Sequence, residues 1–364
     1  MPSALTREEA QLFHHFTRHL GRWLDCTNAP RLFTLLVSER ATESSVLCNA
    51  VLCFSARHQG LFVAAEEAYE RCISLLIKRL SLGSDSYDES PTHSSPGDKR
   101  HLKGTSSILR ASTTKRRIDP AATSLREAAF WVYVRQCLYN ATISQESLDL
   151  DFTLTLEPIT PADDDKHPLD WLTRSTAWSN HILWNTARIA NFCFSSPGCE
   201  ETSTSRASTW QELWDNNASW QAQRPAEFDP IGSGPPRNGD AFADIWFTAD
   251  WHVISYIFHH FSYILLLRYK PDFKFPTRWV RATLSPDDAR ILNHARAICA
   301  ACKSSMGNPQ LLIILCHTVF IWGPLMSSPA ERASVVRMLS EFEKKHLWRT
   351  QWIVDALQAE WAVG

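Results

Sequence analysis

The sequence has almost no net charge and lacks the usual signatures of catalytic and nucleotide-binding sites. Its 37 lysines and arginines nearly balance 39 aspartates and glutamates, for a formal net charge of -2. Binding to a phosphate backbone requires a basic surface, so we expect no direct DNA binding by this chain. No Gly-rich phosphate loop, G-x-S-x-G turn or H-E-x-x-H motif is present. We therefore predict no cofactor, no metal and no catalytic residues.

Long hydrophobic runs are also missing. The most apolar stretches, residues 253–267 and 311–326, are shorter than the roughly 20 residues of a membrane-spanning helix, and each contains histidine. We interpret them as buried helices of a protein without membrane contact. No secretory signal is found at the start, and the ten cysteines are scattered through apolar segments. Reduced core thiols in an intracellular protein are therefore expected.

Tryptophan is the compositional outlier, with 15 residues in 364. A core filled by such rings must provide partners for their N–H groups and leaves room for aromatic-lined cavities. The 44% hydrophobic and 21% charged fractions are otherwise typical of a globular protein.

Four helix starts are marked by capping boxes, in which a Ser or Thr side chain accepts a backbone N–H and the acidic residue three positions later reaches back. Apolar residues between these starts repeat at helical spacing, and no alternating strand pattern is found. We predict a single all-α domain over residues 1–364, an irregular multi-helix bundle or solenoid-like array without a fixed-period repeat. The capping pairs are Thr6–Glu9, Ser124–Glu127, Ser285–Asp288 and Ser328–Glu331.

Residues 83–123 break the helical pattern. This segment is dominated by Ser, Thr, Asp, Gly, Pro and basic residues, a composition that disfavours a packed core. We predict a long, disordered and mobile surface loop within the domain.

Several segments resemble the regulatory domain of the second fungal-specific transcription-factor family, the ARCA-like group. Their order and spacing also match, and the resemblance extends from about residue 16 to residue 361. It implies an all-helical regulatory domain that acts in the nucleus. The segments are CNAVLCFSARH (48–58), LREAAFWVYVRQ (125–136), RPAEFDP (224–230), IWFTADWHVI (245–254) and FIWG (320–323).

The chain departs from that family in one important respect. A six-cysteine zinc binuclear cluster normally precedes the domain and reads DNA, but here only the residues before Thr6 precede the first helix cap. The resemblance then implies a fungal transcription-regulatory protein that controls a secondary-metabolite or other metabolic gene set. It would act in the nucleus, or in the cytoplasm, through protein partners such as the transcription machinery or a second copy, or through a small-molecule effector. A truncated gene product is a further alternative.

Two polar features interrupt otherwise apolar helices. In the helix that begins after Ser124, Arg135 is either satisfied by structural acceptors or faces a cavity that binds an anion. In a helix predicted over residues 242–269, polar side chains form a stripe that either lines a ligand pocket or seals an inter-helix seam. The stripe consists of His252, Ser255, Tyr256, His259 and Tyr263.

A biosynthetic enzyme of the cyclase or pericyclase kind is the competing hypothesis, because an aromatic-lined helical pocket can fold a polyene without strong acids or bases. A cavity of several hundred Å³ lined by Arg135, His58 or the His252 stripe would favour it. The candidate pocket residues are Arg57, His58, Trp131, Arg135, Gln136, Trp246, His252, Tyr256 and His259.

Two pairs have the spacing of metal ligands. His15 and His19 lie one helical turn apart, but no third ligand is evident. Cys299 and Cys302 form a lone C-x-x-C in a helical pattern, where core-facing thiols are the favoured interpretation.

Overall fold

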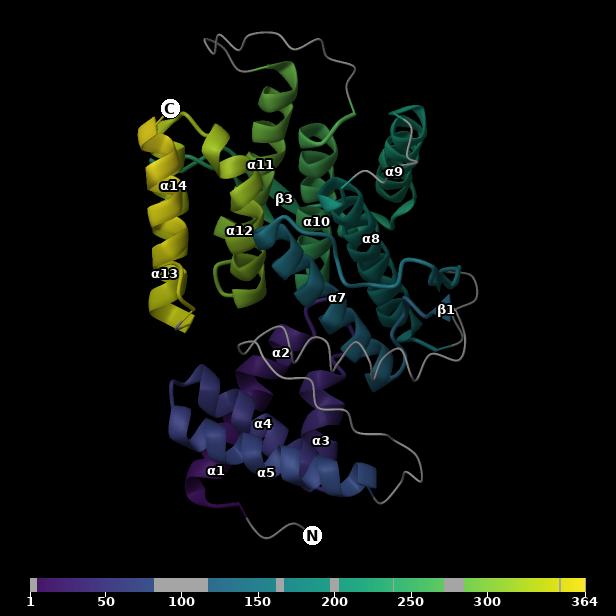
Figure 1. Cartoon of the computed structure of the whole chain (residues 1–364), viewed down its shortest axis with the longest axis vertical. Coiled ribbons are helices and arrows are strands. Elements are labelled where there is room, and N and C mark those ends of the chain that lie inside the picture. Colours follow the sequence, from purple (N-terminus) through teal and green to yellow (C-terminus); the bar gives the residue numbers. More distant parts are fainter. Residues whose placement is uncertain are drawn as a thin grey trace.

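The computed structural model describes residues 5–81, 117–161, 167–196, 203–237, 239–271, 285–346 and 348–363. Helices dominate these ranges, and their strands are only two or three residues long. The predicted all-α, multi-helix fold is thus confirmed. The helices form two parts, an N-terminal helical layer of α1 to α5 and a main bundle of α7 to α14 (Figure 1).

The N-terminal helical layer is a set of short helices joined by π-helical turns and closed by the longer pair α4 and α5. At Gly21, α2 approaches the second π-helical turn so closely that a Cβ would lie 2.9 Å from the Cα of Thr34. A side chain at Gly21 would therefore force the two segments apart. The elements are α1 Arg7–His15, a π-helical turn Phe16–Leu20, α2 Gly21–Leu24, a second π-helical turn Phe33–Val37, α3 Ser38–Ala41, α4 Ser45–His58 and α5 Phe62–Ser81.

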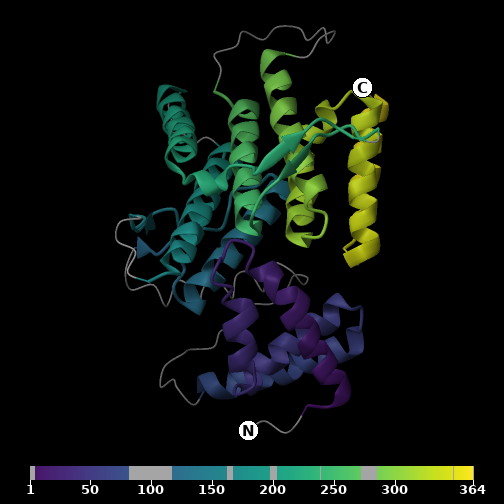
Figure 2. The same ribbon diagram turned by 180° about the vertical axis from the view of Figure 1, so that it is seen from behind.

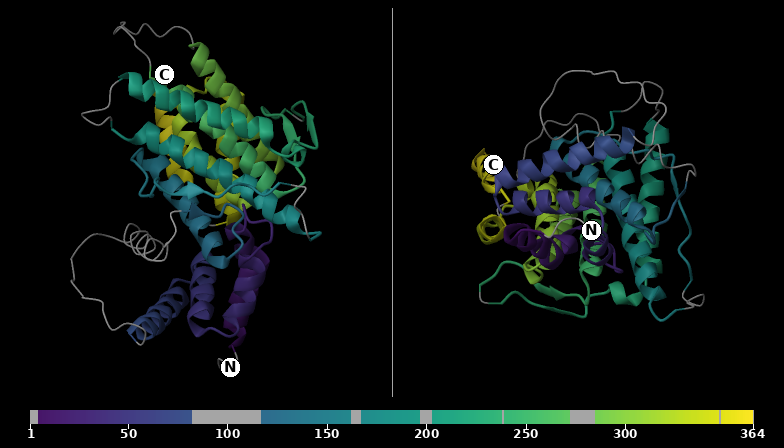
Figure 3. Two further views of the ribbon diagram at one scale, coloured as in Figure 1. Left: turned by 90° about the vertical axis from the view of Figure 1, so that its right-hand side faces the viewer. Right: turned by 90° about the horizontal axis from the view of Figure 1, so that it is seen from below.

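The main bundle is built around α10, which is packed between α8, α11 and α12. Its helices lie in inclined rows above the N-terminal helical layer (Figure 3). The elements are α7 Leu125–Ser144, α8 Asp170–Phe194, α9 Ser203–Gln223, α10 Asp250–Arg268, α11 Pro286–Ser304, α12 Pro309–Trp322, α13 Pro329–His346 and α14 Gln351–Val363.

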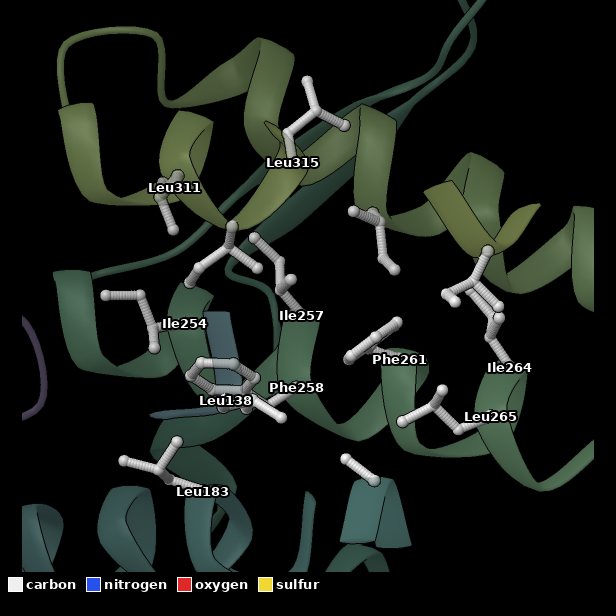
Figure 4. Close-up of a cluster of buried hydrophobic side chains, with 14 of the residues drawn as sticks. Leu138, Leu183, Ile254, Ile257, Phe258, Phe261, Ile264, Leu265, Leu311 and Leu315 are labelled. Carbon is white, nitrogen blue, oxygen red and sulfur yellow. The ribbon is translucent and has the colours of Figure 1, made fainter. Parts of the chain in front are cut away.

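Helix α10 is largely buried between its neighbours. Ile254, Ile257, Phe258 and Phe261 are at most 1% exposed. Figure 4 shows these side chains between Leu311 and Leu315 of α12 and Leu183 of α8. The burial of α10 agrees with the interpretation of residues 253–267 as a buried helix.

The capping boxes predicted at Thr6, Ser124 and Ser285 are confirmed, each with both reciprocal bonds. At the fourth, Ser328 accepts the Glu331 N–H at 3.5 Å. The Glu331 carboxylate instead binds Arg296 of α11 at 2.6 Å. A tertiary ion pair therefore replaces half of the local capping motif.

The helix predicted over residues 242–269 starts too early. Its first part is β4 (Asp244–Trp246), which pairs antiparallel with β3 (Gly232–Gly234). The hairpin crosses the bundle toward the C-terminal helices in Figure 2, where Asp240 pairs with Arg337 of α13 and Lys303 of α11. Helix α10 begins only at Asp250, because Ala249 has an extended backbone.

Of the predicted loop over residues 83–123, residues 83–116 lie outside the described part of the chain. The remainder belongs to the core. Arg117–Ile118 forms β1, which pairs in parallel with β2 (Thr155–Leu156). Ile118 and Ala122 are buried, and the Pro120 carbonyl accepts a hydrogen bond from Asn180 of α8.

Polar contacts attach the N-terminal helical layer to the main bundle. Arg135 of α7 donates to the Leu24 carbonyl at 2.6 Å and to the Thr27 hydroxyl at 2.7 Å. The Ala29 N–H donates to the Thr176 hydroxyl of α8 at 2.9 Å. The loop after α2 is thus held by hydrogen bonds from two bundle helices.

None of the helices in the described ranges combines the length and apolarity needed to cross a membrane.

Candidate functional site

A cleft of about 580 Å³ opens between the N-terminal helical layer and the main bundle. We call it the interlayer cleft. Its volume falls within the range typical of small-molecule sites. The layer contributes His15, Arg18, His19, Arg22, Trp23 and His58, and the bundle contributes Asp250, Ser305, Gly307, Asn308, Pro309, Lys345 and His346.

Histidines from three helices meet at the cleft. His15 is the last residue of α1, His58 of α4 and His346 of α13. Unpaired carbonyls at the C-termini of α4 and α13 favour a positive charge at His58 and His346, whereas at His15 the helix continues through Phe16–Leu20 into α2. The fold therefore gathers three imidazoles from distant parts of the sequence at one opening.

The histidine rings are in direct contact across this opening. His15 Nε2 lies 3.0 Å from His58 Nδ1, a hydrogen-bond distance, and the two rings stack at 5.1 Å. The Trp23 ring meets His58 edge-on at 4.8 Å and His346 at 5.7 Å. Trp23 thus links histidines of the layer and of the bundle.

Burial and mutual repulsion keep these imidazoles neutral. Desolvation lowers the pKa of His15 to about 4, and the neighbouring His58 and His19 add to the shift. Desolvation also lowers the pKa of His58, with His346 as its strongest electrostatic neighbour, and the pKa of His346. A bound anion would oppose this repulsion and favour the protonated forms.

The fixed charge around the cleft is mainly positive. Arg18, Arg22 and Lys345 face a single lining carboxylate, Asp250. Arg22 and Asp250 are 4.0 Å apart and both partly exposed, so their attraction is weak. The lining also includes the start of α10 at Asp250 and of α12 at Pro309. Helix N-termini carry partial positive charge, which adds to the positive potential.

One imidazole atom in the lining has no partner. His58 Nε2 is buried and makes no hydrogen bond within the described residues. A buried polar atom without a partner is costly. Water or a ligand group in the cleft could remove that cost.

Of the predicted residues on α7, Arg135 and Trp131 make structural hydrogen bonds and Gln136 lies on the surface. Arg135 is occupied by Leu24 and Thr27, which is the first of the two alternatives considered for it. Gln136 is exposed. Trp131 is 1% exposed and donates its indole N–H to the Asp119 carbonyl at 3.3 Å. None of the three lines the interlayer cleft.

The polar stripe on α10 lies in seams between helices. His252 contacts the Thr248 hydroxyl at 2.9 Å and packs on Phe228. Ser255 contacts Ser179 of α8 at 2.8 Å. His259 is packed against Trp220 of α9.

The rest of the stripe is likewise occupied by ring contacts. Tyr256 lies against Phe247 and His260, while Tyr263 stacks on His294 of α11. These positions do not border the interlayer cleft.

Two further predicted pocket residues lie elsewhere on the surface. Arg57 is exposed and sits over the Phe62 ring. Trp246 is 40% exposed on β4, beside Arg237. Of the predicted pocket residues, His58 is the one that reaches the cleft.

The pairs with metal-ligand spacing do not gain further ligands. Cys299 and Cys302 are buried free thiols, and Cys302 donates to the Leu311 carbonyl. The His15 and His19 rings are 5.0 Å apart. Across the described ranges, no group of three or more His, Cys, Asp or Glu residues could hold a metal ion.

Sequence reasoning missed most of the cleft. Arg18, Arg22, Asp250, Lys345 and His346 come from three separate segments, so spacing along the chain does not connect them. A usable signal was present: α1, α4 and α13 each have basic residues or histidines in the last turn. That signal also fits ordinary helix ends, so it could not single out this site.

The cleft is suited to binding an anion and is poorly suited to folding a hydrocarbon. Trp23 provides a large aromatic ring, but a polyene would also have to cover Arg18, Arg22 and Lys345 without giving them acceptors. No protein-family model matches the chain, and no curated protein or solved structure matches it either. The resemblance to fungal regulatory domains therefore stays a prediction.

Proposed function

We propose that the protein is an effector-responsive transcription-regulatory protein that acts in the nucleus through protein partners and controls a metabolic gene set. The regulatory role rests on the resemblance of the sequence to fungal regulatory domains, and the position of the interlayer cleft supports the response to an effector. A ligand there would touch Arg22 and His58 of the layer together with Lys345 and His346 of the bundle. Its binding would favour one arrangement of the two parts over another.

The construction of the two parts supports such a response. Hydrogen bonds from Arg135 and Thr176 hold the loop after α2, and the cleft separates other portions of the layer and the bundle. Cys26 and Ala29 of that loop also pack in the bundle core, which resists small displacements, whereas α1, α4 and α5 bury their apolar residues in separate, smaller clusters. The layer is thus the part that an effector can shift.

A reporter assay tests the proposal. The whole chain is fused to an unrelated DNA-binding domain in a fungal host and compared with that domain alone. We expect the fusion to change reporter output, and the charge reversals Arg22→Glu with Lys345→Glu to alter that change by about fivefold or more, the lower end of typical allosteric coupling.

The matched control is Arg188→Glu with Arg290→Glu, two partly exposed arginines of the bundle that do not line the cleft. It should behave like the parent, with fusion levels checked by immunoblot. Reporter output equal to that of the DNA-binding domain alone would contradict the regulatory proposal. Equal effects of the cleft and control variants would show that the cleft has no specific role in the regulation.

A further inference from the structure

We propose that the interlayer cleft binds a small organic anion with at least two negative charges, and that binding is coupled to protonation of its histidines. The inference rests on the proposed function, whose effector it assigns to a chemical class. Phosphate esters and polycarboxylates share this chemistry.

Charge and size set the ligand class. Arg18, Arg22 and Lys345 outnumber Asp250, which leaves an excess of positive charge before any histidine is protonated. Guanidinium groups bind phosphate and carboxylate oxygens in paired hydrogen bonds. A volume of about 580 Å³ holds a metabolite-sized molecule, and a ligand with one charge would leave part of this excess unpaired.

The histidines allow anion binding to be coupled to proton uptake. The His15–His58 pair at 3.0 Å can share one proton between the facing nitrogens, so full protonation of both rings would oppose two N–H groups. An anion in the cleft can accept from a ring that turns toward it and offsets its charge. Protonation and anion binding then stabilise each other.

Groups from every element around the cleft act on this equilibrium. The neighbours of the histidines are positive or neutral, apart from Asp250 at the start of α10. They are His14, His15, Arg18 and His19 from α1 and the turn after it, Arg22 from α2, His58 from α4, and Lys345 and His346 from α13. With so much positive charge nearby, an empty cleft disfavours the imidazolium and an occupied one favours it.

Calorimetric titration of the whole chain with benzene-1,3-disulfonate tests both the binding of an anion and its coupling to protonation. This probe keeps its two charges between about pH 6 and about pH 8, which bracket the ordinary histidine pKa. We expect binding to be roughly tenfold tighter at the lower pH, as one linked proton would give over about one pH unit. Repeating the titration in two buffers of different ionisation enthalpy should show proton uptake.

Substitutions locate the site. Arg18→Gln with Lys345→Gln should weaken binding by about tenfold or more, since two charge-assisted contacts are lost. Arg188→Gln with Arg290→Gln should leave it unchanged. All four positions are at least partly exposed, and circular dichroism with thermal melting verifies that both variants are folded.

Titrations with pyrophosphate and with citrate then distinguish phosphate ligands from carboxylate ligands. The tighter binder identifies the chemical class of the ligand. Failure of all three anions to bind at millimolar concentration would overturn the proposal, as would binding that the cleft substitutions do not weaken. Binding without pH dependence or proton uptake would overturn the histidine coupling. A regulator with a neutral effector would keep its reporter response and bind none of the anions, so the two proposals can fail separately.

Discussion

The main bundle and the N-terminal helical layer bury their apolar side chains in different ways. In the bundle, one continuous cluster extends through α7 to α14, with α10 at its centre, and also takes in Cys26 and Ala29 of the loop after α2. The layer holds two smaller clusters, one around Leu52 and Ala65 and one around Phe16, Leu20 and Trp23. Each small cluster has less apolar surface to protect from water.

This difference indicates which part is free to respond. A large close-packed core resists rearrangement, whereas smaller clusters can open locally at a lower cost in free energy. The interlayer cleft lies where the two kinds of packing meet, and its titratable groups come from both. Substitutions in the two parts test whether they differ in this way.

Phe261→Ala should remove about 3–5 kcal/mol from the free energy of unfolding, because Phe261 is fully buried in α10 and its loss leaves a cavity. The matched change in the layer is Phe62→Ala, where the ring is 63% exposed and the cost should stay within about 0.5 kcal/mol. Urea denaturation followed by circular dichroism measures both. Similar costs would show that the bundle core is not the dominant source of stability.

Arg135→Gln should loosen the layer while leaving the bundle intact. The change removes donors to the Leu24 carbonyl and the Thr27 hydroxyl, at a cost of about 2–3 kcal/mol for bonds from a charged group. Hydrogen exchange should become faster in α1 to α5 and stay unchanged in α10. Gln136→Ala, a change at the neighbouring exposed position, is the control. Uniformly faster exchange in both parts would show that they unfold as one unit.

Acid should weaken the bundle through the pair His260–His294, whose Nδ1 atoms lie 2.8 Å apart. Burial lowers the pKa of His294 to about 4, against 6.5 for the ordinary group. The unfolded chain therefore takes up protons first, and stability present above pH 6.5 is lost as the pH falls toward 4.

Between about pH 7 and about pH 5, His294 should account for a loss of about 1–2 kcal/mol, allowing for its partial exposure. His294→Gln should remove that part of the pH dependence in urea titrations. His167→Gln, at an exposed position before α8, is the matched control. An unchanged acid profile in His294→Gln would assign the loss to other groups.

Ser124→Ala should cost about 1 kcal/mol, the usual value for an N-cap side chain. Ser124 accepts the Glu127 N–H, and the Glu127 carboxylate accepts the Ser124 N–H in return. Ser144→Ala at the other end of α7, where the hydroxyl only donates to the Asn140 carbonyl, should have a smaller effect. Thermal melting compares them. Equal shifts would mean that the cap adds nothing beyond tertiary packing.

Much of the helical fold could be predicted from the sequence. The capping boxes at Thr6, Ser124 and Ser285 set helix starts because their hydrogen bonds join residues three positions apart. The apolar stretch in α10 indicated a buried helix because it has no polar face wide enough for solvent. The start of α10 was predicted wrongly, since β4 is formed by pairing with β3 and the apolar residues Ile245 and Trp246 also suit a helix.

Local hydrogen bonds and apolar periodicity were enough to predict the all-α class, the helix starts at three capping boxes and the burial of residues 253–267. Tertiary structure alone decided the candidate site. His15, His58 and His346 lie far apart in the sequence, and only the packing of α1, α4 and α13 brings them to one cleft. Arg135 shows the converse, because its partners on the loop after α2 are remote in sequence and turned a candidate ligand residue into a structural one.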